Sequence, residues 1–97
     1  MIAEDGAWSI QSGEQPTMVN RVVLKEDLTC GGEIRAFRVY AHLPGYREKR
    51  VCVYKGDTVG HKAICTFPTI RTAKLTVEVE AGEGDCRLTD MKAFFVK

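Results

Sequence analysis

Apolar and polar residues alternate with a period of two along most of this 97-residue chain. Between residues 34 and 43, one face carries the apolar side chains Phe37, Val39, Ala41 and Leu43. The other face carries Arg38, Tyr40 and His42, and the stretch Lys74–Glu80 repeats the alternation. Successive side chains of a β-strand point to opposite faces, so this pattern predicts strands that are buried on one side only.

Four further segments complete a set of six expected strands. Met18–Leu24 is almost continuously apolar, which is typical of a central strand in a sandwich. Asp90–Lys97 has apolar residues on both faces, so we expect it to be covered on both sides. Arg50–Tyr54 and Lys62–Phe67 are the remaining two.

Glycine-rich and proline-containing turns separate these segments, and no sustained helical pattern is present. At most one helical turn is expected, at Leu24–Leu28. Short strands with turns between them favour an all-β fold, an antiparallel β-sandwich or barrel. The length allows one domain, residues 1–97, in which residues 1–16 form a poorly patterned N-terminal segment.

The charge balance narrows the choice of partners. Fourteen Lys and Arg residues face 13 Asp and Glu residues, a net charge of +1. This gives little support to nucleic-acid binding, which usually needs a basic excess. No apolar run approaches the roughly 18 residues of a membrane-spanning helix, so neither a nucleic acid nor a membrane is expected as a partner.

The four cysteines are compatible with two interpretations, disulfide bonds or free thiols. None is at C-x-x-C spacing with another, so a zinc site is not expected. Four cysteines allow three disulfide pairings in an oxidising compartment, whereas four free, mostly buried thiols are the simpler expectation. Cys52 and Cys65 are expected on neighbouring strands, where they would be able to approach each other.

Catalytic signatures are lacking in the sequence. There is no G-x-S-x-G, P-loop, H-E-x-x-H or G-x-G-x-x-G motif. Glu78 and Glu80 are close in sequence, but a glycosidase pair must flank a bond inside a cleft. We therefore expect no catalysis by this chain, with a small stand-alone enzyme as a remote alternative.

Two long stretches and the chain's ending resemble one known family. Val19–Leu43 is similar to a segment of the type FNRVVLQEDI…GQRI, and Gly56–Val79 to GTTIGYKRILRFP. The matching residues are Asn20, Arg21, Val22, Val23, Leu24, Glu26, Asp27, Gly32, Phe37, Gly56, Thr58, Gly60, Lys62, Ile64, Phe67, Pro68 and Lys74. These motifs resemble the C-terminal discoidin-like domain (coagulation factor V/VIII type C, galactose-binding-like) of bacterial α-L-fucosidases. The chain departs from that pattern in its short N-terminus, which lacks the family's opening strands, and in having His61 where the family has Tyr.

The resemblance implies a jelly-roll β-sandwich that serves as a non-catalytic, carbohydrate-binding-like accessory module, because the catalytic carboxylates of such enzymes lie in a separate barrel domain. The implied partner is a fucosylated or galactosyl glycan, or the glycosidase catalytic domain itself. The alternative is a packing or oligomerisation domain with no sugar site, including a homo-oligomer formed through an open sheet edge. The sequence leaves the localisation open. No signal peptide is recognisable, so the bacterial cytoplasm is expected if the chain is complete, and a secreted or periplasmic location if it is part of a larger enzyme.

A sugar site needs an aromatic platform and planar polar groups. Loop-adjacent residues of these kinds are Trp8, His42, Tyr46, Arg47 and His61. The alternatives are a core position for Trp8, a solvated turn for Tyr46 and Arg47, and a purely structural place for His61.

A structural calcium ion is also implied by the resemblance. Such domains hold it with acidic residues of an N-terminal loop and one near the C-terminus. The corresponding residues here are Asp5 and Asp90. Calcium requires six to eight oxygen ligands, which a shortened N-terminal loop is poorly equipped to supply.

Overall fold

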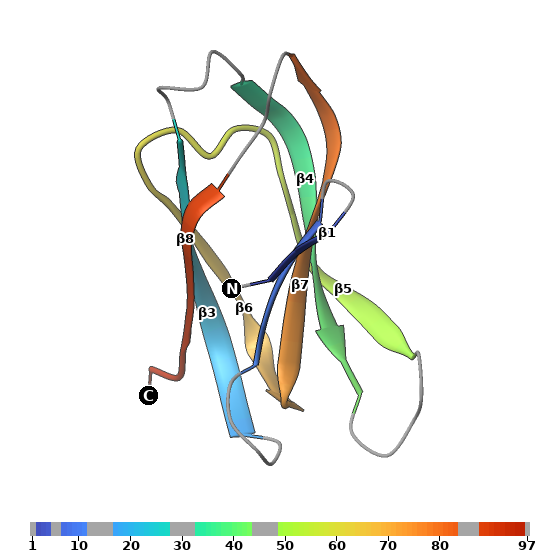
Figure 1. The fold of residues 1–97 in the computed structure, drawn as a ribbon. Coiled ribbons are helices and arrows are strands. Elements are labelled where there is room, and N and C mark those ends of the chain that lie inside the picture. Colours follow the sequence, from blue (N-terminus) through green and yellow to red (C-terminus); the bar gives the residue numbers. More distant parts are fainter. Residues whose placement is uncertain are drawn as a thin grey trace.

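The chain folds into two antiparallel β-sheets that face each other (Figure 1). The computed structural model describes residues 2–4, 7–11, 17–27, 33–43, 49–83 and 88–96, with only the backbone of residues 2–4 and 83. The strands are β1 (Ile2–Glu4), β2 (Ala7–Gln11), β3 (Thr17–Glu26), β4 (Glu33–His42), β5 (Arg50–Gly56), β6 (Ala63–Thr72), β7 (Lys74–Glu83) and β8 (Leu88–Phe94). The described residues include no helix long and apolar enough to cross a membrane.

One sheet has five strands in the order β1-β2-β7-β4-β5, and the other has three in the order β6-β3-β8. Every pairing is antiparallel. The central strands are therefore β7 and β3, and β8 forms an edge of the smaller sheet on the side where β2 lies. The expected all-β class and two-sheet sandwich are thus confirmed.

The core lies between the two sheets and is made of the inward side chains of both. In the larger sheet, Trp8, Val77 and Val39 lie side by side in register. In the smaller sheet, Cys65, Val22 and Ala93 do the same. The buried apolar residues are Trp8, Val19, Val22, Leu24, Ile34, Phe37, Val39, Ala41, Val59, Cys65, Phe67, Leu75, Val77, Leu88 and Met91. The period-two pattern therefore identifies the inward faces of β4 and β7 correctly.

The N-terminal region contains more structure than its pattern predicts. Two strands, β1 and β2, lie within residues 1–16 and extend the five-stranded sheet beyond β7. They are short, three and five residues, so alternation has little room to show. The expectation of a helical turn at Leu24–Leu28 is wrong, because β3 continues through Glu26 and pairs there with β8.

Pro68 interrupts the ladder between β6 and β3. Arg21 pairs with Thr66 while Val19 pairs with Ile70, so the intervening residues of β6 bulge opposite Asn20. Proline lacks an N–H group and is tolerated at bulges and on edge strands, and β6 is an edge strand.

Cys52 and Cys65 do not lie on paired strands. Cys52 lies on β5 of the larger sheet and is exposed, whereas Cys65 lies on β6 of the smaller sheet and is buried. Both are free thiols. Cys30 and Cys86 are outside the described residues.

Candidate functional site

The outer face of the five-stranded sheet carries a cluster of polar side chains, here called the polar face. Its members share the outward positions of β2, β4, β5 and β7: Ser9, Arg38, Tyr40, His42, Arg50, Thr76, Glu78 and Glu80. Ser9, Thr76 and Tyr40 are register neighbours in one row across the sheet.

The charged groups of the polar face are paired with one another. Arg38 forms an ion pair with Glu80, and Arg50 Nη1 lies 2.5 Å from Glu78 Oε1. The guanidinium of Arg50 also covers the Tyr40 ring, with 4.1 Å between Cζ and the ring centroid. The carboxylates raise the pKa of both arginines. The Tyr40 ring face beneath Arg50 is consequently not open for stacking against a sugar.

A chain of hydrogen bonds joins three strands on the same face. Ser9 Oγ lies 3.0 Å from Thr76 Oγ1, which lies 2.8 Å from His42 Nε2. Partial burial, followed by the positive charges of Lys74 and Arg50, lowers the pKa of His42. A neutral imidazole can accept or donate a hydrogen bond here. The series of hydrogen bonds from Ser9 through Thr76 to His42 therefore stabilises the sheet without a buried charge.

The outer face of the three-stranded sheet is different in character and is here called the basic face. A shallow groove runs along it, lined by Arg21, Val23, Lys25, Lys62, Ile64, Asp90, Lys92, Phe94 and Val96. The strand register places Arg21 beside Phe94, and Val23 between Ile64 and Lys92. Apolar side chains therefore form a central stripe that cationic side chains surround.

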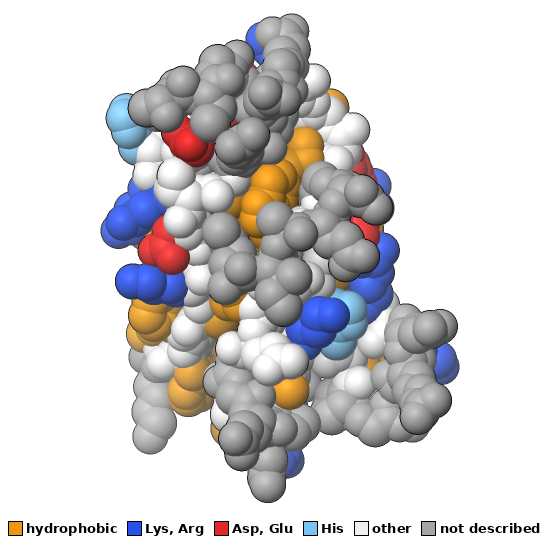
Figure 2. All heavy atoms as spheres, viewed as in Figure 1, with side chains coloured by type: hydrophobic (Ala, Val, Ile, Leu, Met, Phe, Trp, Pro, Cys, Tyr) orange, Lys and Arg blue, Asp and Glu red, His pale blue; other side chains and the backbone are white. Residues whose placement is uncertain are grey.

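The apolar stripe is open to solvent in the described part of the chain. Ile64 is 50% exposed, and Phe94 and Val96 are each 44% exposed. Asn20 fixes the backbone of Val96 with two hydrogen bonds: its Nδ2 donates to the Val96 carbonyl at 2.7 Å, and its Oδ1 accepts from the Val96 N–H at 3.0 Å. Val96 is thus held against the sheet although it follows the end of β8. Figure 2 shows apolar and charged side chains together along the edge of the molecule where β8 lies.

A second hollow opens between the two sheets where β2 and β8 approach each other. Ile10, Val19, Met91, Ala93 and Phe95 provide its apolar lining. Residues 12–16, which connect β2 to β3 along the chain, lie outside the described residues.

The structure places the predicted sugar-site residues in separate surroundings. Trp8 is 6% exposed and points into the core, which is the alternative named for it above. His42 lies on the opposite face of the same sheet, in the hydrogen-bonded chain. His61 is exposed in the connection between β5 and β6. Tyr46 and Arg47 lie outside the described residues.

The described residues do not fit a calcium site. Asp90 Oδ1 accepts the backbone N–H of Met91, and its Oδ2 lies 3.7 Å from the ammonium of Lys92. No group of three or more His, Cys, Asp or Glu side chains in the described ranges is placed to hold a metal ion. Asp5, the other predicted ligand, is outside those ranges.

Three carboxylates make structural contacts in the part of the chain that the structure describes. Glu78 and Glu80 lie on an outer sheet face, each held by an arginine. Glu26 is buried and accepts hydrogen bonds from the backbone N–H groups of Ile34 and Gly60. None of these three carboxylates faces another across a cleft, as the two acids of a glycosidase do.

The basic face is the feature that the sequence interpretation missed. The expectation that Asp90–Lys97 is covered on both sides is wrong for the described chain, because the outward side chains of Phe94 and Val96 are each 44% exposed. The alternation of Arg21, Val23 and Lys25 along β3 is visible in the sequence. The nearly continuous apolar character of Met18–Leu24, typical of a central sandwich strand, obscures this alternation.

Structural comparison relates nearly the whole chain to a small part of much longer proteins. A protein assigned as an α-L-fucosidase from Bacteroides thetaiotaomicron matches 95% of this chain over 20% of its own, with 26% identity and a TM-score of 0.84. A second protein assigned as an α-L-fucosidase, from Bacteroides ovatus, matches 92% of this chain over 16% of its own length, with 28% identity and a TM-score of 0.74. A glycoside hydrolase 29 family member from an unknown rumen bacterium matches 97% over 18%, with 24% identity and a TM-score of 0.81. No protein-family model and no curated protein matches the sequence.

Proposed function

We propose that this chain is a non-catalytic accessory domain that acts together with an α-L-fucosidase catalytic domain of the glycoside hydrolase 29 type. The observation that carries the proposal is the coverage of the matches. Nearly all of this chain superimposes on about one fifth of fucosidase chains, 95% against 20% in one case. The greater part of each fucosidase chain lies outside the matched segment, and a catalytic barrel would have to lie in that part.

The proposed fold type is the discoidin-like, galactose-binding-like jelly roll that the sequence motifs resemble. Support comes from the two antiparallel sheets and from the positions of the motif residues Asn20, Glu26 and Gly60, which each make a contact that organises the sandwich.

The accessory role takes one of two forms, sugar binding or packing against the catalytic domain. The described surface favours packing, because Trp8 is buried and the Tyr40 ring is covered. Three of the exposed large apolar side chains, Ile64, Phe94 and Val96, lie together on the basic face. A sugar platform would need an exposed aromatic ring beside hydrogen-bonding groups. Tyr46, Arg47, His42 and His61 remain the candidate residues for that form.

Hydrolysis of 4-nitrophenyl α-L-fucopyranoside tests the non-catalytic assignment. The chain alone is expected to release no nitrophenol above the uncatalysed background, while a complete fucosidase assayed alongside does. Steady turnover by the purified chain, abolished by Glu78→Gln or Glu80→Gln, would overturn the assignment.

Titration of the ¹⁵N-labelled chain with L-fucose and galactose separates the two accessory forms. Packing alone predicts no saturable chemical-shift changes at tens of millimolar sugar. Saturable changes clustered at His42, Tyr46 and Arg47 would instead establish the sugar-binding form.

A further inference from the structure

The basic face combines an open apolar stripe with an uneven charge distribution. Of the charged side chains that line its groove, four are cationic (Arg21, Lys25, Lys62 and Lys92) and one, Asp90, is anionic. These leave a net charge of +3 on one face of a chain whose total is +1. On the polar face, by contrast, Arg38 and Arg50 are neutralised by glutamates.

Arg21 lies next to the apolar stripe of the basic face. The Nε atom of Arg21 is buried and makes no hydrogen bond. Arg21 lies beside Phe94 in the sheet register, at the edge of the apolar stripe. The positive charge of Arg21 therefore lies at the border of the apolar stripe, where a carboxylate on the rim of a partner would be favourable.

We propose that the basic face is the surface by which this chain docks onto its fucosidase catalytic domain, against a patch of that domain that is apolar at its centre and carries carboxylates at its rim. This inference rests on the proposed function and names the surface and the partner chemistry. Apolar contact with Val23, Ile64, Phe94 and Val96 supplies the driving force, and the surrounding cations select an acidic partner.

The charge distribution argues against a second copy of the chain as the occupant. Two basic faces brought together would place cations opposite cations, and like charges across an interface oppose association. A protein partner also suits the shape of the surface, since the stripe spans all three strands and Val96 is fixed in place by Asn20 before docking.

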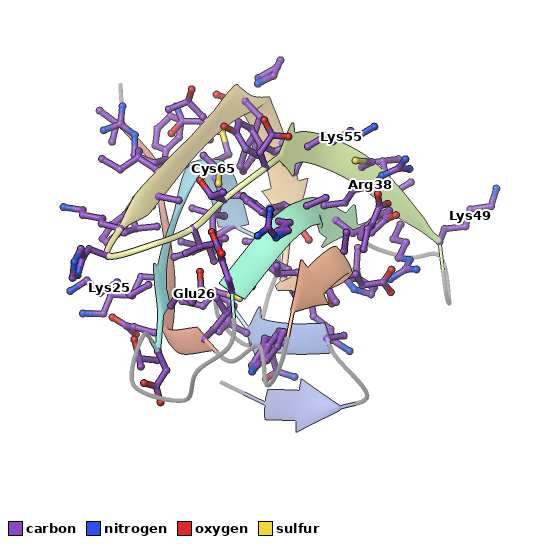
Figure 3. All side chains as sticks on the ribbon, turned by 90° about the horizontal axis from the view of Figure 1, so that it is seen from above. Lys25, Glu26, Arg38, Lys49, Lys55 and Cys65 are labelled. Atoms are coloured by element: carbon purple, nitrogen blue, oxygen red, sulfur yellow. The ribbon has the colours of Figure 1, made fainter. Side chains whose placement is uncertain are left out.

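The lysines of the chain provide a direct readout of docking. Lys25, Lys62 and Lys92 line the groove and are exposed. Lys49 and Lys55 are also exposed, but Lys55 lies on β5 of the five-stranded sheet and Lys49 directly precedes that strand. Figure 3 shows both on the side of the molecule away from Lys25. Acetylation rates measured by mass spectrometry therefore compare the two faces within one protein.

The experiment uses a chimera in which this chain replaces the matched fifth of the Bacteroides thetaiotaomicron enzyme. Relative to the isolated chain, we expect acetylation of Lys25, Lys62 and Lys92 to slow by about tenfold while Lys49 and Lys55 are unchanged. Protection of Lys49 and Lys55 instead would overturn the docking surface and leave the proposed function standing. Protection of no lysine would overturn both.

Matched charge reversals test whether the cations select the partner. The double variant Lys25→Glu/Lys62→Glu is expected to restore fast acetylation of Lys92 in the chimera. The control Lys49→Glu/Lys55→Glu makes the same change in net charge and should leave Lys92 protected. Equal behaviour of the two variants would contradict the selection of an acidic partner.

An anionic membrane is the competing occupant for a basic and apolar surface. Acetylation of the isolated chain is therefore also measured in the presence of phosphatidylserine-containing vesicles. We expect no protection of Lys25, Lys62 and Lys92 by the vesicles. Protection by vesicles without protection in the chimera would overturn the proposal.

Discussion

Glu26 and Gly60 hold each other by two hydrogen bonds at one end of the sandwich. The Glu26 N–H donates to the Gly60 carbonyl at 3.0 Å, and Glu26 Oε1 accepts from the Gly60 N–H at 3.1 Å. Its other oxygen, Oε2, accepts from the Ile34 N–H at 2.9 Å. One buried carboxylate therefore ties the end of β3 to the start of β4 and to the connection between β5 and β6.

Replacing Glu26 should destabilise the fold strongly. Glu26→Ala leaves the N–H groups of Ile34 and Gly60 without their acceptor, for an expected loss of about 3 kcal/mol in the free energy of unfolding. Urea denaturation measures this loss. Glu80→Ala is the control, because its ion pair with Arg38 is exposed and screened by solvent, so its removal should change the unfolding free energy little. Equal losses in the two variants would contradict the bridging role.

Two glycines should respond differently to alanine. Gly60 has φ +62° with open space around its Cα, so Gly60→Ala should cost about 1 kcal/mol from backbone strain alone. At Gly56 an added Cβ would lie 2.5 Å from Cζ of the buried Phe37 ring, which stacks on Tyr54. Gly56→Ala should therefore cost more, up to about 3 kcal/mol. The reverse order of unfolding midpoints would contradict the packing around Phe37.

His42 should make stability depend on pH on the acidic side of neutrality. Burial and the nearby Lys74 and Arg50 lower the pKa of His42 in the folded chain. As pH falls below about 6.5, the unfolded chain takes up a proton on this residue that the folded chain resists, so stability falls until the folded pKa is also passed. His42→Gln should show a smaller fall in melting temperature between pH 7.5 and pH 5. A variant with the same pH dependence as the parent would refute this origin.

The two described cysteines should differ sharply in reactivity. Burial raises the pKa of the Cys65 thiol to about 11, whereas Cys52 is exposed on β5. Iodoacetamide at pH 8 should alkylate Cys52 in the native protein and reach Cys65 only after unfolding. Peptide mapping distinguishes the two sites. Rapid native labelling of Cys65 would show that β6 opens readily.

The sequence pattern predicted the strands that alternate over many residues and failed where alternation was short or masked. Phe37, Val39, Leu75 and Val77 lie inward as expected, because each sits in a ten-residue strand with a solvated outer face. The five-residue β2 has too few positions to show a period, although its Trp8 is part of the core.

The candidate sites are formed by contacts between strands that are far apart in the sequence. The hydrophobic pattern of one sequence carries no information about such contacts. The cation–π contact between Arg50 and Tyr40 and the hydrogen bond from Asn20 to Val96 both join residues that only sheet pairing brings together. The motif residues Asn20, Glu26 and Gly60 proved to make structural contacts, so the resemblance they carry reports on the fold more than on a binding site.

The measurement that tests the central proposal most directly is the thermal stability of the fucosidase chimera. The Bacteroides thetaiotaomicron enzyme is compared in three forms: intact, with the matched fifth deleted, and with this chain in its place. An accessory domain that docks on the catalytic domain should stabilise it, so fucosidase activity in the chimera should survive heating to within a few degrees of the intact enzyme and well above the deleted form. A chimera that loses activity at the same temperature as the deleted form, while this chain within it remains folded, would contradict the proposal.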